Sequence, residues 1–192
     1  SRLVEAGPGG RRWLILALGW RAMLDDGMGA RVVARRGHRD ALRLGRQWMV
    51  DSHPTVSAAR FNLAGLAMQD GAFVDARGQY EDALRAARGA YPPGHKELIA
   101  VRSELQRVHR ILGDYGAALL HGEAIVRATA DDGQRRDDRV FALTNTGRVY
   151  LERGDMAAAG RVLDEAIRLI ETHRPDDVAS LKAALINRGR AD

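Results

Sequence analysis

A glycine recurs at a nearly constant interval along this chain of 192 residues, and small residues follow it at fixed offsets. The spacings are 42, 42 and 41 residues between Gly29, Gly71, Gly113 and Gly154. An alanine stands five residues after each glycine, at Ala34, Ala76, Ala118 and Ala159. A period of this length predicts stacked supersecondary units rather than one closed core, so we expect the function on an extended surface.

The composition favours helices and no other regular structure. Alanine, leucine and arginine are abundant, whereas aromatic residues make up only 5% of the chain, so an all-α protein is expected. The absence of cysteine excludes disulfides and Cys-ligated zinc and is compatible with a cytoplasmic location, which we expect. The most apolar run, from Trp13 to Trp20, is much shorter than the roughly 20 residues that span a bilayer. We therefore expect no membrane association.

Each unit is predicted to consist of two amphipathic helices joined near the recurring glycine. In the second unit, helix A is expected at about 56–69 and helix B at about 73–89. Gly71 separates them, because glycine adopts the left-handed conformation that ends a helix at little steric cost. Helix B carries an apolar stripe at helical spacings, Phe73, Ala76, Tyr80, Ala83 and Leu84.

The same plan applies to the whole chain. We expect a single superhelical domain, residues 1–192, with repeats at about 11–52, 53–94, 95–136 and 137–174 and a final helix at 176–190. A charged linker is expected at 130–139. His53 and His95 recur just before a helix A and are expected to cap or orient it. In the less regular first repeat, the stripe Val33, Ala34, Leu42 and Trp48 is expected to be buried.

These residues resemble the tetratricopeptide repeats (TPR), whose helix-turn-helix consensus has an aromatic residue two positions after the turn glycine and alanines five and twelve after it. The second repeat matches at Phe73, Ala76 and Ala83, and the third matches at Tyr115 and Ala118 but has Ile125 at the last position. The long period is similar to kinesin-light-chain repeats rather than to the 34-residue form. The resemblance implies an α-solenoid of about four repeats with a terminal helix.

The resemblance also implies a peptide-binding face on the A helices. In this family, the residue that recurrently binds the peptide backbone is an asparagine nine residues before the turn glycine. In this chain that position holds Trp20, Asn62, Glu104 and Asn145. An amide can donate to a peptide carbonyl and accept from a peptide N–H together. The alternative is that a helical asparagine near a turn simply faces solvent.

Neighbouring positions on the same face are expected to complete the peptide-binding site. They hold Phe61 in the second repeat, Arg107 and Arg110 in the third, and Arg148 in the fourth. Converging arginines would favour a carboxylate, a phosphate or an acidic peptide through forked charge-assisted bonds. Two alternatives remain open: arginine is abundant enough to need no special role, and Glu104 can pair with Arg107 within one helix.

No constellation for catalysis or metal binding is evident. The segment Gly7-Pro8-Gly9-Gly10 lacks the preceding strand and following Lys-Ser/Thr of a phosphate-binding loop, and the six histidines have no metal-ligand spacing. We therefore expect no enzymatic activity, no cofactor and no bound metal.

Three functions follow from these features. The favoured one is a non-catalytic scaffold for a peptide or partner domain, acidic partners included, within a larger bacterial regulatory or signalling protein. The alternative is binding of nucleic acid or an anionic surface through the first repeat, since residues 1–50 carry ten arginines against four acidic residues. Self-association through apolar faces of the terminal helices is a third hypothesis.

Overall fold

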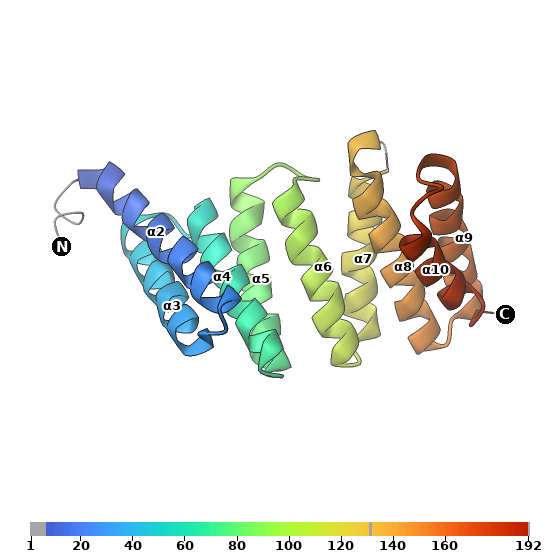
Figure 1. The fold of residues 1–192 in the computed structure, drawn as a ribbon, viewed down its shortest axis with the longest axis horizontal. Coiled ribbons are helices and arrows are strands. Elements are labelled where there is room, and N and C mark those ends of the chain that lie inside the picture. Colours follow the sequence, from blue (N-terminus) through green and yellow to red (C-terminus); the bar gives the residue numbers. More distant parts are fainter. Residues whose placement is uncertain (1–6, 131, 192) are drawn as a thin grey trace. The chain divides into compact units, whose positions relative to one another are not determined.

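The computed structural model describes residues 7–130 and 132–191, and every regular element among them is helical (Figure 1). This confirms the all-α prediction. None of the described helices is long and apolar enough to span a membrane. The elements are α2 (Gly7–Gly27), α3 (Arg31–Trp48), α4 (Pro54–Gln69), α5 (Phe73–Ala90), α6 (Lys96–Ile111), α7 (Tyr115–Ala128), the 3-10 turn η1 (Gly133–Arg135), α8 (Arg136–Arg153), α9 (Met156–His173) and α10 (Val178–Arg188).

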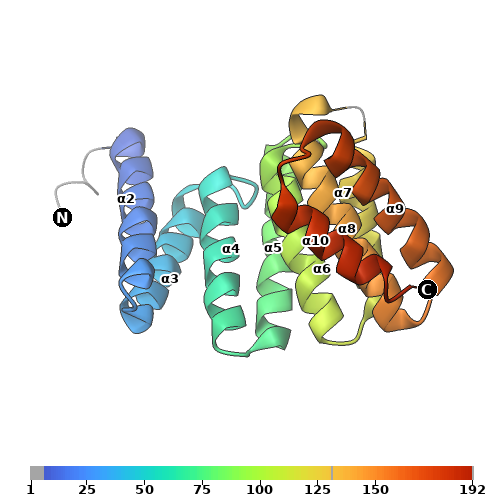
Figure 2. The same cartoon turned by 45° about the vertical axis from the view of Figure 1, so that its right-hand side comes forward.

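The helices form two compact units, divided between Pro92 and Pro93. The first unit contains the pairs α2/α3 and α4/α5, with α3 packed against α4. The second contains α6/α7 and α8/α9, with α7 packed against α8, and Figure 2 shows α10 beside α8 and α9 at its end. Each unit therefore contains two helix pairs, and the predicted bounds of the repeats stay a prediction. The single superhelical domain stays a prediction.

The recurring glycines end helix A or join it to helix B in the left-handed conformation. Their φ angles are positive, for example 75° at Gly71 and 89° at Gly154, where a side chain would be strained. The alanines five residues later are completely buried, each with 0% exposure: Ala34, Ala76, Ala118 and Ala159. Every repeat thus needs a glycine for the left-handed turn and a small residue at one buried position, and these two needs produce the period in the sequence.

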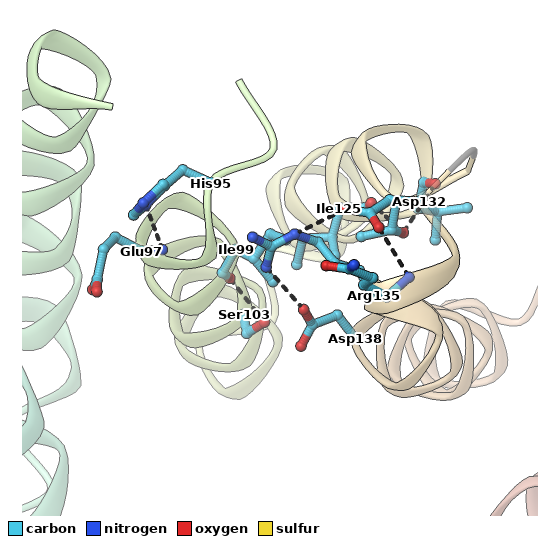
Figure 3. A network of polar contacts seen from close by, with 11 residues as sticks. His95, Glu97, Ile99, Ser103, Ile125, Asp132, Arg135 and Asp138 are labelled. Carbon is cyan, nitrogen blue, oxygen red and sulfur yellow. Dashed lines mark hydrogen bonds and ion pairs between the residues drawn. The ribbon is translucent and has the colours of Figure 1, made fainter. Parts of the chain in front are cut away.

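The segment before α8 is more helical than expected. The sequence predicted a linker at 130–139, but η1 leads directly into α8 at Arg136. Asp132 accepts a hydrogen bond from the Gln134 N–H at 2.9 Å, and Arg135 forms ion pairs with both Asp132 and Asp138 (Figure 3). Asp138 also lies in the first turn of α8, where a negative charge stabilises the exposed N–H groups. The charges that suggested a linker instead start a helix.

The expected buried stripe of the first repeat is only partly correct. Ala34 is buried and Leu42 and Trp48 are half-buried, but Val33 is 51% exposed. The buried side of α3 follows Ala34, His38 and Ala41, and Val33 is rotated by about 100° from Ala34 on a helix of 3.6 residues per turn. The prediction for Val33 was therefore wrong.

The two linker histidines cap the helices that follow them, as predicted. The Nδ1 atom of His53 accepts a hydrogen bond from the Thr55 N–H at 3.2 Å, and Nδ1 of His95 accepts one from the Glu97 N–H at 3.3 Å. Figure 3 shows His95 above the first turn of α6. Because each Nδ1 is an acceptor, the cap requires that this nitrogen carry no proton.

The His53 cap is expected to make the stability of the first unit depend on pH. Burial, reinforced by the nearby Arg12 guanidinium, lowers the pKa of His53 below its usual value. Between the folded-state pKa and the unfolded value of about 6.5, the unfolded chain binds more protons. The stabilisation that the His53 cap gives is therefore present above about pH 6.5, and it is lost as the pH falls towards the pKa of His53 in the folded state.

His53→Asn is the matched variant, because asparagine caps helices without titrating. Urea unfolding at pH 7.5 and pH 5.5 should show a smaller loss of stability in the variant than in the wild type, by up to about 1 kcal/mol. Burial also lowers the pKa of His38. Because His38 is present in both proteins, the stability of the variant should still depend on pH to some extent. Equal losses in the two proteins would contradict a titrating cap.

Candidate functional site

Five of the eight residues selected from the sequence line one groove in the second unit. The groove lies between α6 and α8, the two A helices of that unit, and has a volume of about 140 Å³. We call it the α6–α8 groove. Its lining comprises Ser103, Glu104, Gln106, Arg107 and Arg110 from α6, and Phe141, Asn145, Arg148 and Val149 from α8.

Two hydrogen bonds fix the register of α6 against α8. The buried Gln106 Nε2 donates to Thr146 Oγ1 at 3.1 Å, and Arg110 Nη1 donates to Glu152 Oε1 at 2.9 Å. The partners are 40 and 42 residues apart in sequence, so the two helices run in the same direction. The groove therefore has an ordered series of side chains along both walls.

The three arginines of the groove all contact carboxylates of the chain itself. Arg107 pairs with Glu104 at 2.6 Å, which confirms that this intrahelical pair forms. Glu152 receives both Arg110, at 2.9 Å, and Arg148, at 3.1 Å. Three guanidinium groups thus face two carboxylates. The cluster therefore has one excess positive charge. Arg107 and Arg148 are about half exposed, so a ligand can reach both of them.

Asn145 lies between an apolar and a basic part of the groove. Phe141 precedes it by four residues on α8 and is 57% exposed, and Arg148 follows it by three. The half-buried amide of Asn145 has no hydrogen-bond partner within the described part of the chain. Its donor and acceptor are therefore both available to a ligand.

Trp20 and Asn62 lie together in a different cavity, in the first unit. This cavity is a hollow of about 100 Å³ between α2 and α4, closed below by α3. We call it the α2–α4 hollow. Like Asn145, Asn62 is half-buried and has no hydrogen-bond partner among the described residues. The two sequence-selected asparagines thus belong to separate cavities.

Phe61 is not part of either cavity lining. Its ring packs edge-on against the buried Tyr80 of α5, with the ring centroids 5.4 Å apart. This contact joins the two helices of the second repeat. The structure assigns Phe61 a packing role, and its contribution to peptide binding stays a prediction.

The arginines of α3 form a mixed surface rather than a purely basic one. Arg35 pairs with Asp70, Arg43 lies 3.8 Å from Asp40, and Arg46 lies 3.9 Å from Asp51. Arg31, Arg36 and Arg39 have no acidic partner among the described residues. Three of the six arginines of α3, the helix that supplies most of the basic residues of the first repeat, are therefore already close to a carboxylate.

Sequence reasoning missed Glu152, which pairs with two arginines of the α6–α8 groove, and Gln106, which lines the groove. Glu152 follows Arg148 by four residues, a spacing that favours a helical ion pair, but its bond to Arg110 crosses between repeats. Gln106 was not selected because its partner, Thr146, is forty residues away. Among the described residues, no group of three or more histidine, aspartate or glutamate side chains is placed to hold a metal ion.

No protein-family model matches the sequence, and no curated protein matches it. Solved structures do match in fold. BtubC (BKLC) from P. vanneervenii superposes with a TM-score of 0.78 and 22% identity over 84% of this chain, which covers 65% of BtubC. The TPR-like repeats of a kinesin light chain described from Podosopora anserina give a TM-score of 0.78 and 18% identity, with 92% of this chain and 84% of that chain covered.

A variant of the Podosopora anserina protein gives a TM-score of 0.80 at 18% identity, over the same shares of both chains. Identities at this level establish the fold and leave function to the site residues. The chain spans slightly less than two thirds of BtubC. The helix pairs, the turn glycines and these structural matches together show that the chain has the TPR-like helical-repeat fold, an α-solenoid architecture.

Proposed function

We propose that the chain is a non-catalytic interaction scaffold that binds an extended peptide of a partner protein along the α6–α8 groove. The observation that carries this proposal is the unpartnered amide of Asn145, placed between an exposed phenylalanine and three arginines. A peptide backbone offers the donor and acceptor pair that such an amide can satisfy. Asn62 provides the equivalent amide in the first unit.

The groove favours a partner segment with one apolar and one acidic side chain. Phe141 offers apolar surface, while the arginine cluster has one guanidinium more than it has carboxylates. Phe141 and Arg148 are seven residues apart on α8, or about 10 Å at 1.5 Å per residue. An extended peptide covers that distance in about three residues, so the two side chains should be about three positions apart.

Substitutions in the groove should change affinity in opposite directions. Peptides selected from a displayed library on the wild-type chain should bind Asn145→Ala about tenfold more weakly, because two hydrogen bonds to the peptide backbone are lost. Glu152→Gln should strengthen binding of acidic peptides several-fold, since it removes the carboxylate that neutralises Arg110 and Arg148. Fluorescence anisotropy at low and moderate salt would measure both.

Two controls separate this groove from general effects. Arg161→Gln removes an exposed arginine of α9 that lies outside the groove, and it should leave affinity unchanged. The double variant Asn62→Ala/Asn145→Ala should lose more affinity than Asn145→Ala if a peptide engages both units. Unchanged affinity in the double variant would exclude the A-helix face as the binding site.

The two other hypotheses have weaker structural support. Nucleic-acid or anionic-surface binding would use α3, where half of the six arginines lie near acidic partners. Self-association would use exposed apolar side chains of α2 and α10, among them Trp13, Leu24 and Ile186. A cytoplasmic location and a place in a larger bacterial regulatory protein remain expectations from the sequence.

A further inference from the structure

Helix α2 is apolar on two opposite sides. Its inner side packs within the first unit, where Ile15 and Ala22 are at most 1% exposed. Its outer side carries four apolar residues at spacings of four, three and four, which we call the α2 stripe: Trp13, Ala17, Trp20 and Leu24. All four are exposed, the three large ones by 59% to 68%. A helix that is apolar all round is typical of a buried helix, and a large exposed apolar patch marks an interaction site.

The α2 stripe differs from the same surface of another A helix in the array. Aligned on the turn glycines, the stripe corresponds to four residues of α8: Asp138, Ala142, Asn145 and Val149. Ala142 and Val149 are buried, because they pack with residues of the preceding helix α7. The two positions at which α2 has tryptophan are polar in α8. The tryptophans therefore exceed what packing against a neighbouring repeat requires.

The α2 stripe is symmetric along the helix. Its spacings of four, three and four have a midpoint between residues 18 and 19. If two copies of α2 lie antiparallel, with a twofold axis at this midpoint, Trp13 faces the partner's Leu24 and Ala17 faces the partner's Trp20. The larger indole thus meets the smallest side chain of the stripe. Such self-complementarity is what a twofold interface requires, and the spacing is the one by which helices pack at a shallow angle.

The charges at the two ends of α2 fit the same arrangement. Arg11 and Arg12 precede the stripe, and Asp25 and Asp26 follow it. In an antiparallel pair each basic end meets the partner's acidic end, whereas a parallel pair would bring like charges together. Neither Arg11 nor Arg12 has an acidic partner among the described residues. Their charges are therefore available to a second copy.

We infer that two copies of this chain form a symmetric dimer in which the two α2 stripes pack antiparallel. The inference goes beyond the proposed function, because the dimer needs no peptide. A helix B of another repeat would meet tryptophans where it elsewhere meets polar side chains. A lipid surface would not use the opposite charges at the two ends of α2. A second α2 satisfies both the stripe and the charges.

Sedimentation velocity of the full chain over a range of concentrations tests the dimer. Leu24→Arg should weaken dimerisation about 100-fold, because the twofold axis places two arginines in the interface without acidic partners. Leu24 is 68% exposed in the single chain, so this variant should keep the urea stability of the wild type. Leu185→Arg is the matched control on α10, where Leu185 is 50% exposed, and it should dimerise as the wild type does.

A pair of charge variants tests the antiparallel direction. Arg11→Glu/Arg12→Glu and Asp25→Lys/Asp26→Lys should each dimerise about tenfold more weakly at low salt, since each brings like charges together at both ends of the pair. An equimolar mixture of the two should form a heterodimer and regain the wild-type affinity. Arg11 lies over the Trp48 ring, 5.4 Å from its centroid, so urea unfolding of the first variant checks that the first unit stays folded.

Each result either supports or overturns the inference. A wild type that is monomeric at about 0.5 mM would overturn it, since the dimer would then be too weak to be specific. Dissociation by Leu185→Arg but not by Leu24→Arg would place the contact on α10 instead. Charge variants that dimerise like the wild type, or a mixture that does not regain affinity, would exclude the antiparallel pairing.

Discussion

Gly122→Ala is expected to lower the free energy of unfolding of the second unit by about 2 to 6 kcal/mol. A Cβ at this position of α7 would collide with Gln106 Nε2 and Thr146 Oγ1, and would lie 3.0 Å from Gln106 Cδ. Overpacking a core costs about 1–3 kcal/mol. Separating the Gln106–Thr146 hydrogen bond adds about 1–3 kcal/mol, because both groups are buried and would remain unsatisfied.

Urea unfolding of the full chain measures this loss, and Gly116→Ala is its control on the same helix. The nearest atom to a Cβ at Gly116 is Asp114 Oδ1 at 3.8 Å, an ordinary contact. This control should therefore be neutral or more stable by up to about 1 kcal/mol, through helix propensity. If Gly122→Ala proves as stable as Gly116→Ala, then α7 does not approach α6 and α8 as closely as the structure shows.

The same substitution links packing to the proposed function. Gln106 lines the α6–α8 groove as well as bonding to Thr146, so a displaced Gln106 would change the groove floor and the spacing of its walls. We expect the affinity of selected peptides to fall in Gly122→Ala even at temperatures where the protein is folded. A glycine on helix B thus determines the geometry of a site built from two A helices.

The sequence was sufficient to predict the repeat architecture because the repeat depends on local backbone and packing demands. A positive φ at Gly71 or Gly154 requires glycine, and the fully buried Ala76 and Ala159 require a small side chain. Such demands restrict residue type at single positions, so they recur visibly in the sequence. The caps formed by His53 and His95 were predictable for the same reason.

The details of the candidate site were less predictable because they depend on contacts between repeats. Arg110 was selected by its position on helix A, but its partner Glu152 lies 42 residues away and depends on the register of α6 against α8. Phe61 occupies a similar register, yet its ring packs on Tyr80. Composition gives no rule for choosing between a groove and a neighbouring helix when an aromatic side chain can reach both.

Substitutions at the contact between Gly147 and Leu163 should also lower the free energy of unfolding strongly. A double-mutant cycle can test this contact. A Cβ at Gly147 of α8 would lie 2.5 Å from Leu163 Cγ and 2.7 Å from Cδ2. Leu163 of α9 is completely buried. Leu163→Ala should therefore cost about 2–5 kcal/mol through the cavity that it leaves. Gly147→Ala should cost about 1–3 kcal/mol through overpacking.

The double variant Gly147→Ala/Leu163→Ala tests whether the two losses of stability arise from the same contact. If the Leu163 side chain is what excludes a methyl group at Gly147, that methyl group fits into the cavity left by Leu163→Ala and partly fills it. The double variant should then be more stable than the sum of the single losses predicts, by about 0.5–3 kcal/mol, which is the coupling typical of residues in contact. Additive losses in urea unfolding would mean that α8 and α9 do not meet at this point. Because α8 also forms one wall of the peptide groove, such a result would remove the support on which the position of Asn145 depends.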